Sequence, residues 1–214
     1  MRATILAAVA ALAFSLPAQA AVNLVQDGNF DSPAASGSFT SYTNGQSFGG
    51  WTVTGDSVDL IGSYWGAPVG GGSVDLAGTS AGGIYQTIAA PIGTYNLSFY
   101  LAGNPDGGNA LKNVQVTLLS GLSVDTFNFS FDTTGHSKSA MGYILESLNI
   151  VSHGDPITLQ FSSTDGSTPY GAVIGGINLA AAVPEPASWA MLLLGFGGIG
   201  LLMRRRNGAV SRTV

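Results

Sequence analysis

Strict alternation of apolar and polar residues over short stretches is the feature that most constrains this chain. Tyr95, Leu97, Phe99 and Leu101 alternate with polar or smaller neighbours, and the same period recurs at Val114–Leu118, Phe127–Phe131 and Ile157–Phe161. A period of two places apolar side chains on one face of a strand, as in half-buried strands of antiparallel sheets. Weaker strands are predicted at Val58–Leu60, Ile84–Ile88, Ile144–Ile150 and Val173–Leu179.

Turn-forming residues separate these stretches. Asn104–Asn109, Thr133–Gly135 and Ser163–Gly166 are rich in Gly, Asn, Asp, Ser and Pro, which favour positive φ or side-chain-to-backbone turns. The same region shows no amphipathic helical period of useful length. Many short strands without crossover helices predict an all-β fold, a two-sheet jelly-roll sandwich of about eight to ten strands.

The first twenty residues have the pattern of a cleavable signal peptide. Met1-Arg2 is basic, Ala3–Leu16 is apolar, and Ala18-Gln19-Ala20 provides small residues at the cleavage positions after Pro17. The apolar run is too short to cross a hydrocarbon core of about 30 Å as a helix. We therefore predict cleavage by signal peptidase after residue 20 and a single folded domain over 21–183.

Residues 184–214 form a segment of different character. Pro184-Glu185-Pro186 precedes an uncharged run from Ala187 to Met203, and Arg204, Arg205 and Arg206 follow at once. As a helix this run covers about 25 Å, the short end of a transmembrane span. Arginines at the end of such a span stay on the cytoplasmic side. We therefore predict that residues 187–203 form a helix that is inserted in the inner membrane, transiently or permanently.

The charges of the middle region exclude some functions. Between residues 21 and 183 only Lys112 and Lys138 are basic, whereas eleven of the twelve acidic residues lie there. Nucleic-acid binding needs basic contacts to phosphates, so nucleic acid is excluded as a partner. The chain has no cysteine, which excludes disulfides and thiol chemistry.

The C-terminal pattern resembles the PEP-CTERM sorting signal. Val183-Pro184-Glu185-Pro186-Ala187, the glycine-rich apolar run and the arginine cluster carry the resemblance. It implies an exported protein of a Gram-negative bacterium that is processed by a membrane-embedded exosortase. It also implies a cell-surface or extracellular destination after anchoring in the inner membrane.

The middle region resembles the choice-of-anchor C family over Asn23–Leu179. The resemblance is carried by motifs that include Asp27-Gly28-Asn29-Phe30-Asp31, Gly50-Trp51-Thr52-Val53 and the run Ser57–Trp65. It implies a fold similar to galactose-binding-like jelly rolls and no established activity. Such domains commonly hold a structural calcium between their first and last strands. Asp31 occupies the position of the first acid, but Gly175 and Gly176 replace the expected last-strand ligands, so calcium is left as a possibility.

A loop with two aromatic residues is the predicted ligand site. Tyr64 and Trp65 follow a strand, and sugar-binding sandwiches use loop aromatics because the apolar face of a pyranose stacks on a ring. Asp59, Asp75 and Asn104 are the polar groups expected beside them. The alternative for Trp65 is that it packs its loop onto the core.

Three functions follow from these patterns. The leading hypothesis is a non-catalytic module that associates with extracellular polysaccharide or the cell envelope. The alternatives are a glycan-active hydrolase and a purely structural envelope protein without ligand. Gly78-Thr79-Ser80-Ala81-Gly82 matches a hydrolase nucleophile motif, but the next residues are predicted to form a strand, whereas that motif requires a helix.

Overall fold

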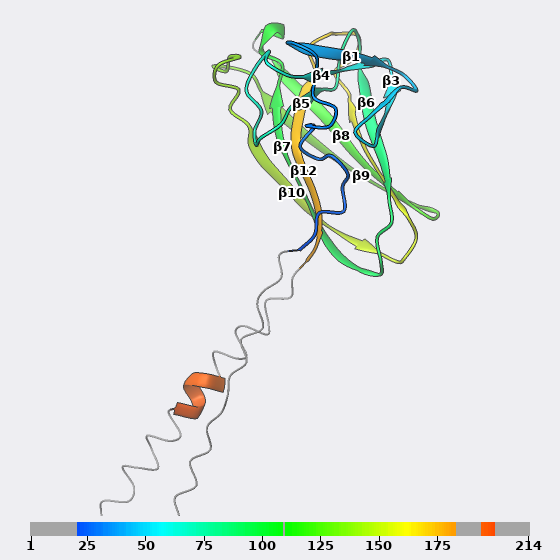
Figure 1. Ribbon diagram of the computed structural model, residues 1–214, viewed down its shortest axis with the longest axis vertical. Coiled ribbons are helices and arrows are strands. Elements are labelled where there is room, and N and C mark those ends of the chain that lie inside the picture. Colours follow the sequence, from blue (N-terminus) through cyan, green and yellow to red (C-terminus); the bar gives the residue numbers. More distant parts are fainter. Residues whose placement is uncertain (1–20, 109, 183–193, 200–214) are drawn as a thin grey trace, which may run out of the picture.

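The structure is a computed structural model that describes residues 21–108, 110–182 and 194–199. Two antiparallel sheets of six strands lie face to face (Figure 1). In spatial order the first sheet contains β1 (Phe39–Thr43), β4 (Ser57–Ile61), β5 (Ser73–Asp75), β12 (Ala172–Ala181), β7 (Gly93–Gly103) and β10 (Ile144–Ser152). The second contains β2 (Ser47–Phe48), β3 (Trp51–Gly55), β6 (Gly82–Ile88), β11 (Ile157–Ser163), β8 (Leu111–Ser120) and β9 (Ser123–Asp132).

The predicted all-β sandwich is confirmed, and all eight predicted strands are present. The described residues hold twelve strands instead of eight to ten. The additional strands are β1, β2, β3 and β5, each of five residues or fewer, which is too short to show a clear period of two. A short 3-10 helix, η1 (Pro105–Gly107), follows β7.

Aromatic side chains from both sheets form the centre of the core. Phe99 of β7 packs edge-on against Phe161 of β11, with ring centroids 5.1 Å apart, and Trp51 of β3 contacts the same Phe161 ring. All three side chains are buried. The alternation read from the sequence therefore faces inward on both sheets, which is the arrangement that a two-layer sandwich requires.

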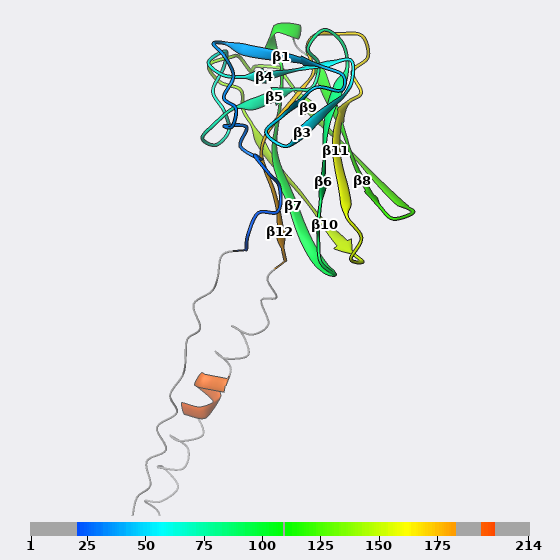
Figure 2. The same cartoon turned by 45° about the vertical axis from the view of Figure 1, so that its right-hand side comes forward.

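The segment before β1 lies along β12, the last strand. The amide of Leu24 donates to the Leu179 carbonyl at 2.8 Å, and the amide of Ile177 donates to the Gly28 carbonyl at 2.9 Å. Gly28 sits so close to the backbone of Ile177 that any side chain there would collide with its carbonyl oxygen. As a result both termini of the sandwich leave it at the same end (Figure 2).

The terminal segments are covered only in part. The predicted signal peptide at 1–20 and most of the tail lie outside the described residues, so the boundaries at 20 and 183 stay predictions. Residues 194–199 are helical. Within the described parts of the chain, no helix has the length and apolar character needed to span a membrane. The predicted span at 187–203 lies largely beyond those parts.

Candidate functional site

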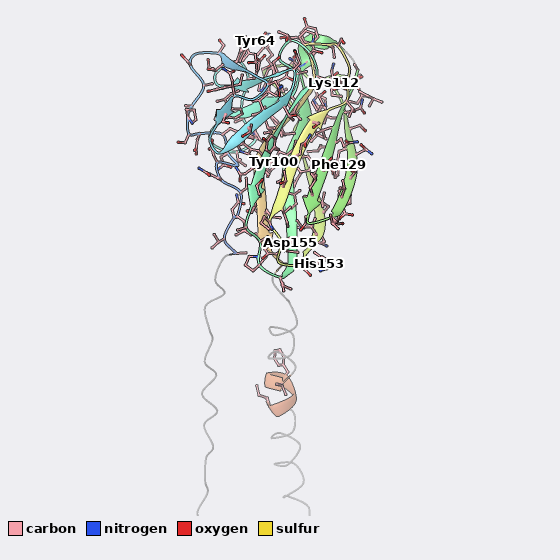
Figure 3. The ribbon with its side chains drawn as sticks, turned by 90° about the vertical axis from the view of Figure 1, so that its right-hand side faces the viewer. Tyr64, Tyr100, Lys112, Phe129, His153 and Asp155 are labelled. Carbon is pink, nitrogen blue, oxygen red and sulfur yellow. The ribbon has the colours of Figure 1, made fainter. Side chains whose placement is uncertain are left out.

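A cleft opens at the end of the sandwich that is distant from the termini. Its volume is about 200 Å³. It is lined by Phe39, Asp59, Ile61, Tyr64, Trp65, Asp75, Gly78, Asn104, Asp106, Pro169 and Tyr170. Tyr64 marks this end in Figure 3, whereas His153 and Asp155 mark the end near the termini. All five residues predicted for ligand binding therefore line one cleft, although their role in binding stays a prediction.

Asp75 forms the floor of the cleft and is only 1% exposed. Its Oδ1 accepts hydrogen bonds from the amides of Ala77 and Gly171, at 3.0 and 3.1 Å. Its Oδ2 accepts one from Asn104 Nδ2 at 2.7 Å. Burial raises the pKa of Asp75 to about 7, and these three donors limit the rise. The carboxyl group thus ties the end of β5 to the start of β12 and to the cap of η1.

Asp59 lies directly opposite Asp75 on the neighbouring strand. The two residues pair in the register of β4 and β5, so their side chains emerge on the same face of the sheet. Asp59 is half-buried and accepts a hydrogen bond from Ser41 Oγ at 2.5 Å. Burial raises the pKa of Asp59 as well. The cleft therefore has two adjacent carboxyl groups, of which Asp59 is the more accessible.

A second polar group forms one rim of the cleft. Tyr64 Oη donates to Asp106 Oδ2 at 2.7 Å, and Lys138 Nζ lies 2.9 Å from the same oxygen. The Lys138 ammonium also lies 3.9 Å from the centre of the Tyr64 ring. Burial opposes ionisation of Asp106, but the bonds from Tyr64 and Lys138 hold its pKa below the usual value. Lys138 is thereby already paired with a carboxylate of the rim.

Trp65 contributes less open surface than its position in a loop predicts. It is 5% exposed, and its Nε1 donates to Ser73 Oγ at 3.0 Å. Its ring packs against Tyr64, with centroids 5.2 Å apart. Most of the Trp65 ring is therefore in contact with the core, which agrees with the alternative that Trp65 packs its loop onto the core. Its remaining edge lines the cleft.

Phe39 and Tyr170 are the aromatic rings of the cleft that are open to solvent. They are 44% and 37% exposed, respectively, and Phe39 packs edge-on against Tyr64 at 5.7 Å. Neither was singled out from the sequence, nor were Asp106 and Lys138. Phe39 lies in a strand too short to be recognised. Tyr170 could have been found as an aromatic residue directly before the last strand, among turn residues.

The resemblance to galactose-binding-like jelly rolls implies a calcium site at the start of the domain. Asp31 is exposed, and the neighbouring Asp27 has a buried Oδ2 without a hydrogen-bond partner, while its Oδ1 accepts from the amides of Asp31 and Ser32. Burial raises the pKa of Asp27. Gly175 and Gly176 give β12 a bulge but no carboxylate. Within the described residues, no three His, Cys, Asp or Glu side chains gather in a way that could hold a metal ion.

The hydrolase-like motif at Gly78–Gly82 forms a turn. Ala77 and Ala81 bridge to each other, and Gly82 begins strand β6. A nucleophile elbow requires a helix after the serine, and here a strand follows instead. The geometry therefore gives Ser80 no means of activation as a nucleophile of that type.

Comparison with known proteins explains the tail. The model of the PEP-CTERM protein-sorting motif matches residues 182–206. The chain carries this sorting signal. The match includes Pro184, Glu185 and Pro186 and the arginines 204–206, and it indicates an exported protein that is sorted to the cell surface.

Solved structures resemble the sandwich. The TmCBM61 structure in complex with β-1,4-galactotriose is 15% identical, covers 75% of this chain and 99% of its own, and has a TM-score of 0.53. A CBM35 structure from Paenibacillus barcinonensis is 18% identical, covers 67% and 99%, and has a TM-score of 0.45. The sandwich thus has the same overall fold as the TmCBM61 structure.

One curated relative matches at the sequence level. Halomucin of Haloquadratum walsbyi is 26% identical in an alignment of 198 positions that covers 78% of this chain. The chain spans only 2% of the length of that protein. This similarity is therefore confined to a small part of halomucin.

Proposed function

We propose that this exported protein is a non-catalytic module that binds extracellular polysaccharide through the cleft beside Tyr64. The observation that carries the proposal is the convergence of open aromatic rings and polar side chains in one cleft. Strand β1, the segments after β4, β5 and β7, and the segment before β12 all contribute to it. Support also comes from the fold, which is that of carbohydrate-binding modules.

The exposed rings account for the apolar part of sugar binding. Phe39 and Tyr170 present open faces at the cleft, and a pyranose has an apolar face that stacks on such rings. Asp59 has one oxygen that accepts from Ser41 and a second that can accept from a sugar hydroxyl. A site with flat apolar faces and few fixed polar groups is typical of small-ligand recognition.

The charges in the cleft select among sugars. Asp59, Asp75 and Asp106 line it. Of the two lysines at this end, Lys138 is paired with Asp106, and Lys112 Nζ lies beside Gly107 and Tyr170. A uronic acid would bring a further carboxylate beside these three acidic residues, which is unfavourable at short range. We therefore expect neutral sugars or amino sugars to bind in preference to polyuronates.

Binding is favoured over hydrolysis by the state of Asp75. A glycosidase uses two carboxyl groups across the scissile bond, one of them with a raised pKa, and Asp59 with Asp75 meets that description in part. However, Asp75 is almost fully buried, and its oxygens receive three hydrogen bonds from within the protein. A general acid must reach the leaving oxygen of the substrate, whereas Asp75 is only 1% exposed.

The test is retention of the purified chain on a panel of insoluble or gel-embedded polysaccharides. The panel contains a neutral galactan, an amino-sugar polymer and a polyuronate. Truncation of the exposed rings in Tyr170→Ala or Phe39→Ala should weaken retention about tenfold, roughly 1.4 kcal/mol. Leu122→Ala, which shortens an exposed apolar side chain at the other end, is the matched control.

The outcomes separate the three functions. Retention that is lost in Tyr170→Ala but kept in Leu122→Ala supports the proposed site. Release of reducing ends from the polysaccharide would instead identify a hydrolase. Absence of retention on every member of the panel would favour a purely structural envelope protein.

A further inference from the structure

The end of the sandwich near the termini carries large apolar side chains on its loop tips. Leu122, in the turn between β8 and β9, is fully exposed, and Ile92, in the loop between β6 and β7, is 80% exposed. Val151, near the end of β10, is 62% exposed, and Val124 of β9 is similarly open. In a soluble domain such tips normally carry polar residues, so their composition requires an explanation.

These tips lie at one end of the molecule. Ser152 Oγ at the end of β10 donates to the Ala90 carbonyl of the loop that holds Ile92, at 2.7 Å. The turn at Gly154 approaches the Ile92 side chain, and the turn at Gly121 approaches Asp155. The three loops are thus contiguous. We refer to Ile92, Leu122, Val124 and Val151 as the apolar end.

The sorting tail starts from the same end. The amide of Ala182, the last described residue of the sandwich, donates to the carbonyl of Thr94 in β7 at 2.8 Å. Thr94 is two positions after Ile92, so the chain leaves the sandwich beside the loop that holds Ile92. The uncharged run begins at Ala187, five residues later. Five residues span at most about 17 Å even when fully extended. A membrane that holds the run therefore lies within reach of the apolar end.

We propose that the apolar end rests on the lipid surface in which the sorting tail is inserted. This inference relies on insertion of the run at 187–203, as predicted from its sequence, and is independent of the cleft. Lipid is the occupant that the tether brings to this surface. The contact holds the sandwich upright, with the cleft at the opposite end and facing away from the membrane (Figure 3).

The charges indicate how the contact forms. Asp125 and Asp155 lie near the apolar end, while the two bases of the sandwich, Lys112 and Lys138, lie toward the other end. Attraction of basic residues to anionic lipid is therefore not available to this surface. Burial of apolar side chains at the headgroup boundary is the remaining driving force, so the contact should not weaken as the salt concentration rises.

The experiment uses the full chain in lipid nanodiscs of phosphatidylethanolamine and phosphatidylglycerol. Because the chain has no cysteine, Leu122→Cys and Ser139→Cys each give a single site for an environment-sensitive fluorophore. Ser139 is exposed and lies between β9 and β10, at the cleft end. Spin-labelled headgroups should quench emission at residue 122 and leave residue 139 unquenched, in low and in high salt.

A pair of charge variants provides the second measurement. In the chain labelled at residue 122, Ile92→Asp should remove most of the quenching. Leu111→Asp, which places the same charge at an exposed apolar position on the other end, should not change it. Equal quenching at residues 122 and 139, or none at either, would overturn the proposal. A chain that does not remain with the discs would overturn it too, because the tail would then not be inserted.

Discussion

Replacement of Asp75 should remove a specific pH dependence of stability. Burial raises the pKa of Asp75 to about 7 in the folded protein, whereas an aspartate in an unfolded chain titrates near 3.9. Between about pH 4 and pH 7 the folded protein holds a proton that the unfolded chain has lost. The stabilisation is therefore fully present below about pH 4 and is lost as the pH rises through about 7.

The size of the effect follows from the difference between the two pKa values. Each pKa unit corresponds to about 1.36 kcal/mol, so raising the pH from 5 to 8 should cost roughly 2 to 3 kcal/mol of unfolding free energy. For a domain of this size that lowers the melting temperature by roughly 5 to 10 °C. Asp75→Asn has no such titration, so its melting temperature should change less over the same range.

The assay is thermal unfolding of the purified chain in mild detergent, followed by near-UV circular dichroism from pH 5 to pH 8. Asp75→Asn also places an amide opposite Asn104 Nδ2, two donors facing each other, which lowers stability at every pH. The slope against pH, and not the absolute value, is thus the informative quantity. Asp155→Asn, an exposed acid at the other end, is the control. Parallel slopes for the wild type and Asp75→Asn would refute the reasoning.

Three further predictions concern the core, the metal and the tail. Trp65→Ala should lower the unfolding free energy by about 3 to 5 kcal/mol in denaturant titrations, because the ring is buried; a loss of polysaccharide retention alone would show a binding role instead. Calcium should shift the melting temperature little. A calcium site filled at 100 times its dissociation constant would instead add about 2.7 kcal/mol to the free energy of unfolding, so a shift of several degrees would mean that other oxygens complete a site beside Asp27. Surface protein from cells with exosortase should have lost its tail near Pro184–Pro186 by intact-mass measurement, and a mature form that retains 204–214 would make the tail a plain anchor.

The sandwich could be predicted because its longer strands carry a complete period of two. Leu97, Phe99 and Leu159 are all buried, as the alternation requires. Four of the five described strands with five residues or fewer escaped, because so few residues give too few alternations. Strand order could not be predicted either. The placement of β12 between β5 and β7 depends on contacts between residues roughly 70 to 100 positions apart in the sequence.

The sequence predicted several residues of the cleft but not how their side chains are arranged. Asp59 and Asp75 were chosen as polar residues near aromatic ones, but their pairing depends on the register of β4 and β5, which no local pattern encodes. Two roles were open for Trp65 from the sequence, and its low exposure depends on the bond from its indole to Ser73, which no local pattern indicates. Phe39 and Tyr170 come from distant segments, so only the folded chain brings them together.

The position of β12 has a consequence for the order of events during export. This strand is the last of the described strands along the chain, yet it lies in the interior of its sheet, bonded to β5 on one side and β7 on the other. The first sheet therefore cannot close until residue 181 has emerged from the translocation channel. By then the sorting segment is the next to arrive, so folding is completed only when the tail is already at the membrane. Strand order therefore sets when folding and sorting occur relative to each other, because the sandwich lacks an interior strand until the sorting signal is about to leave the channel.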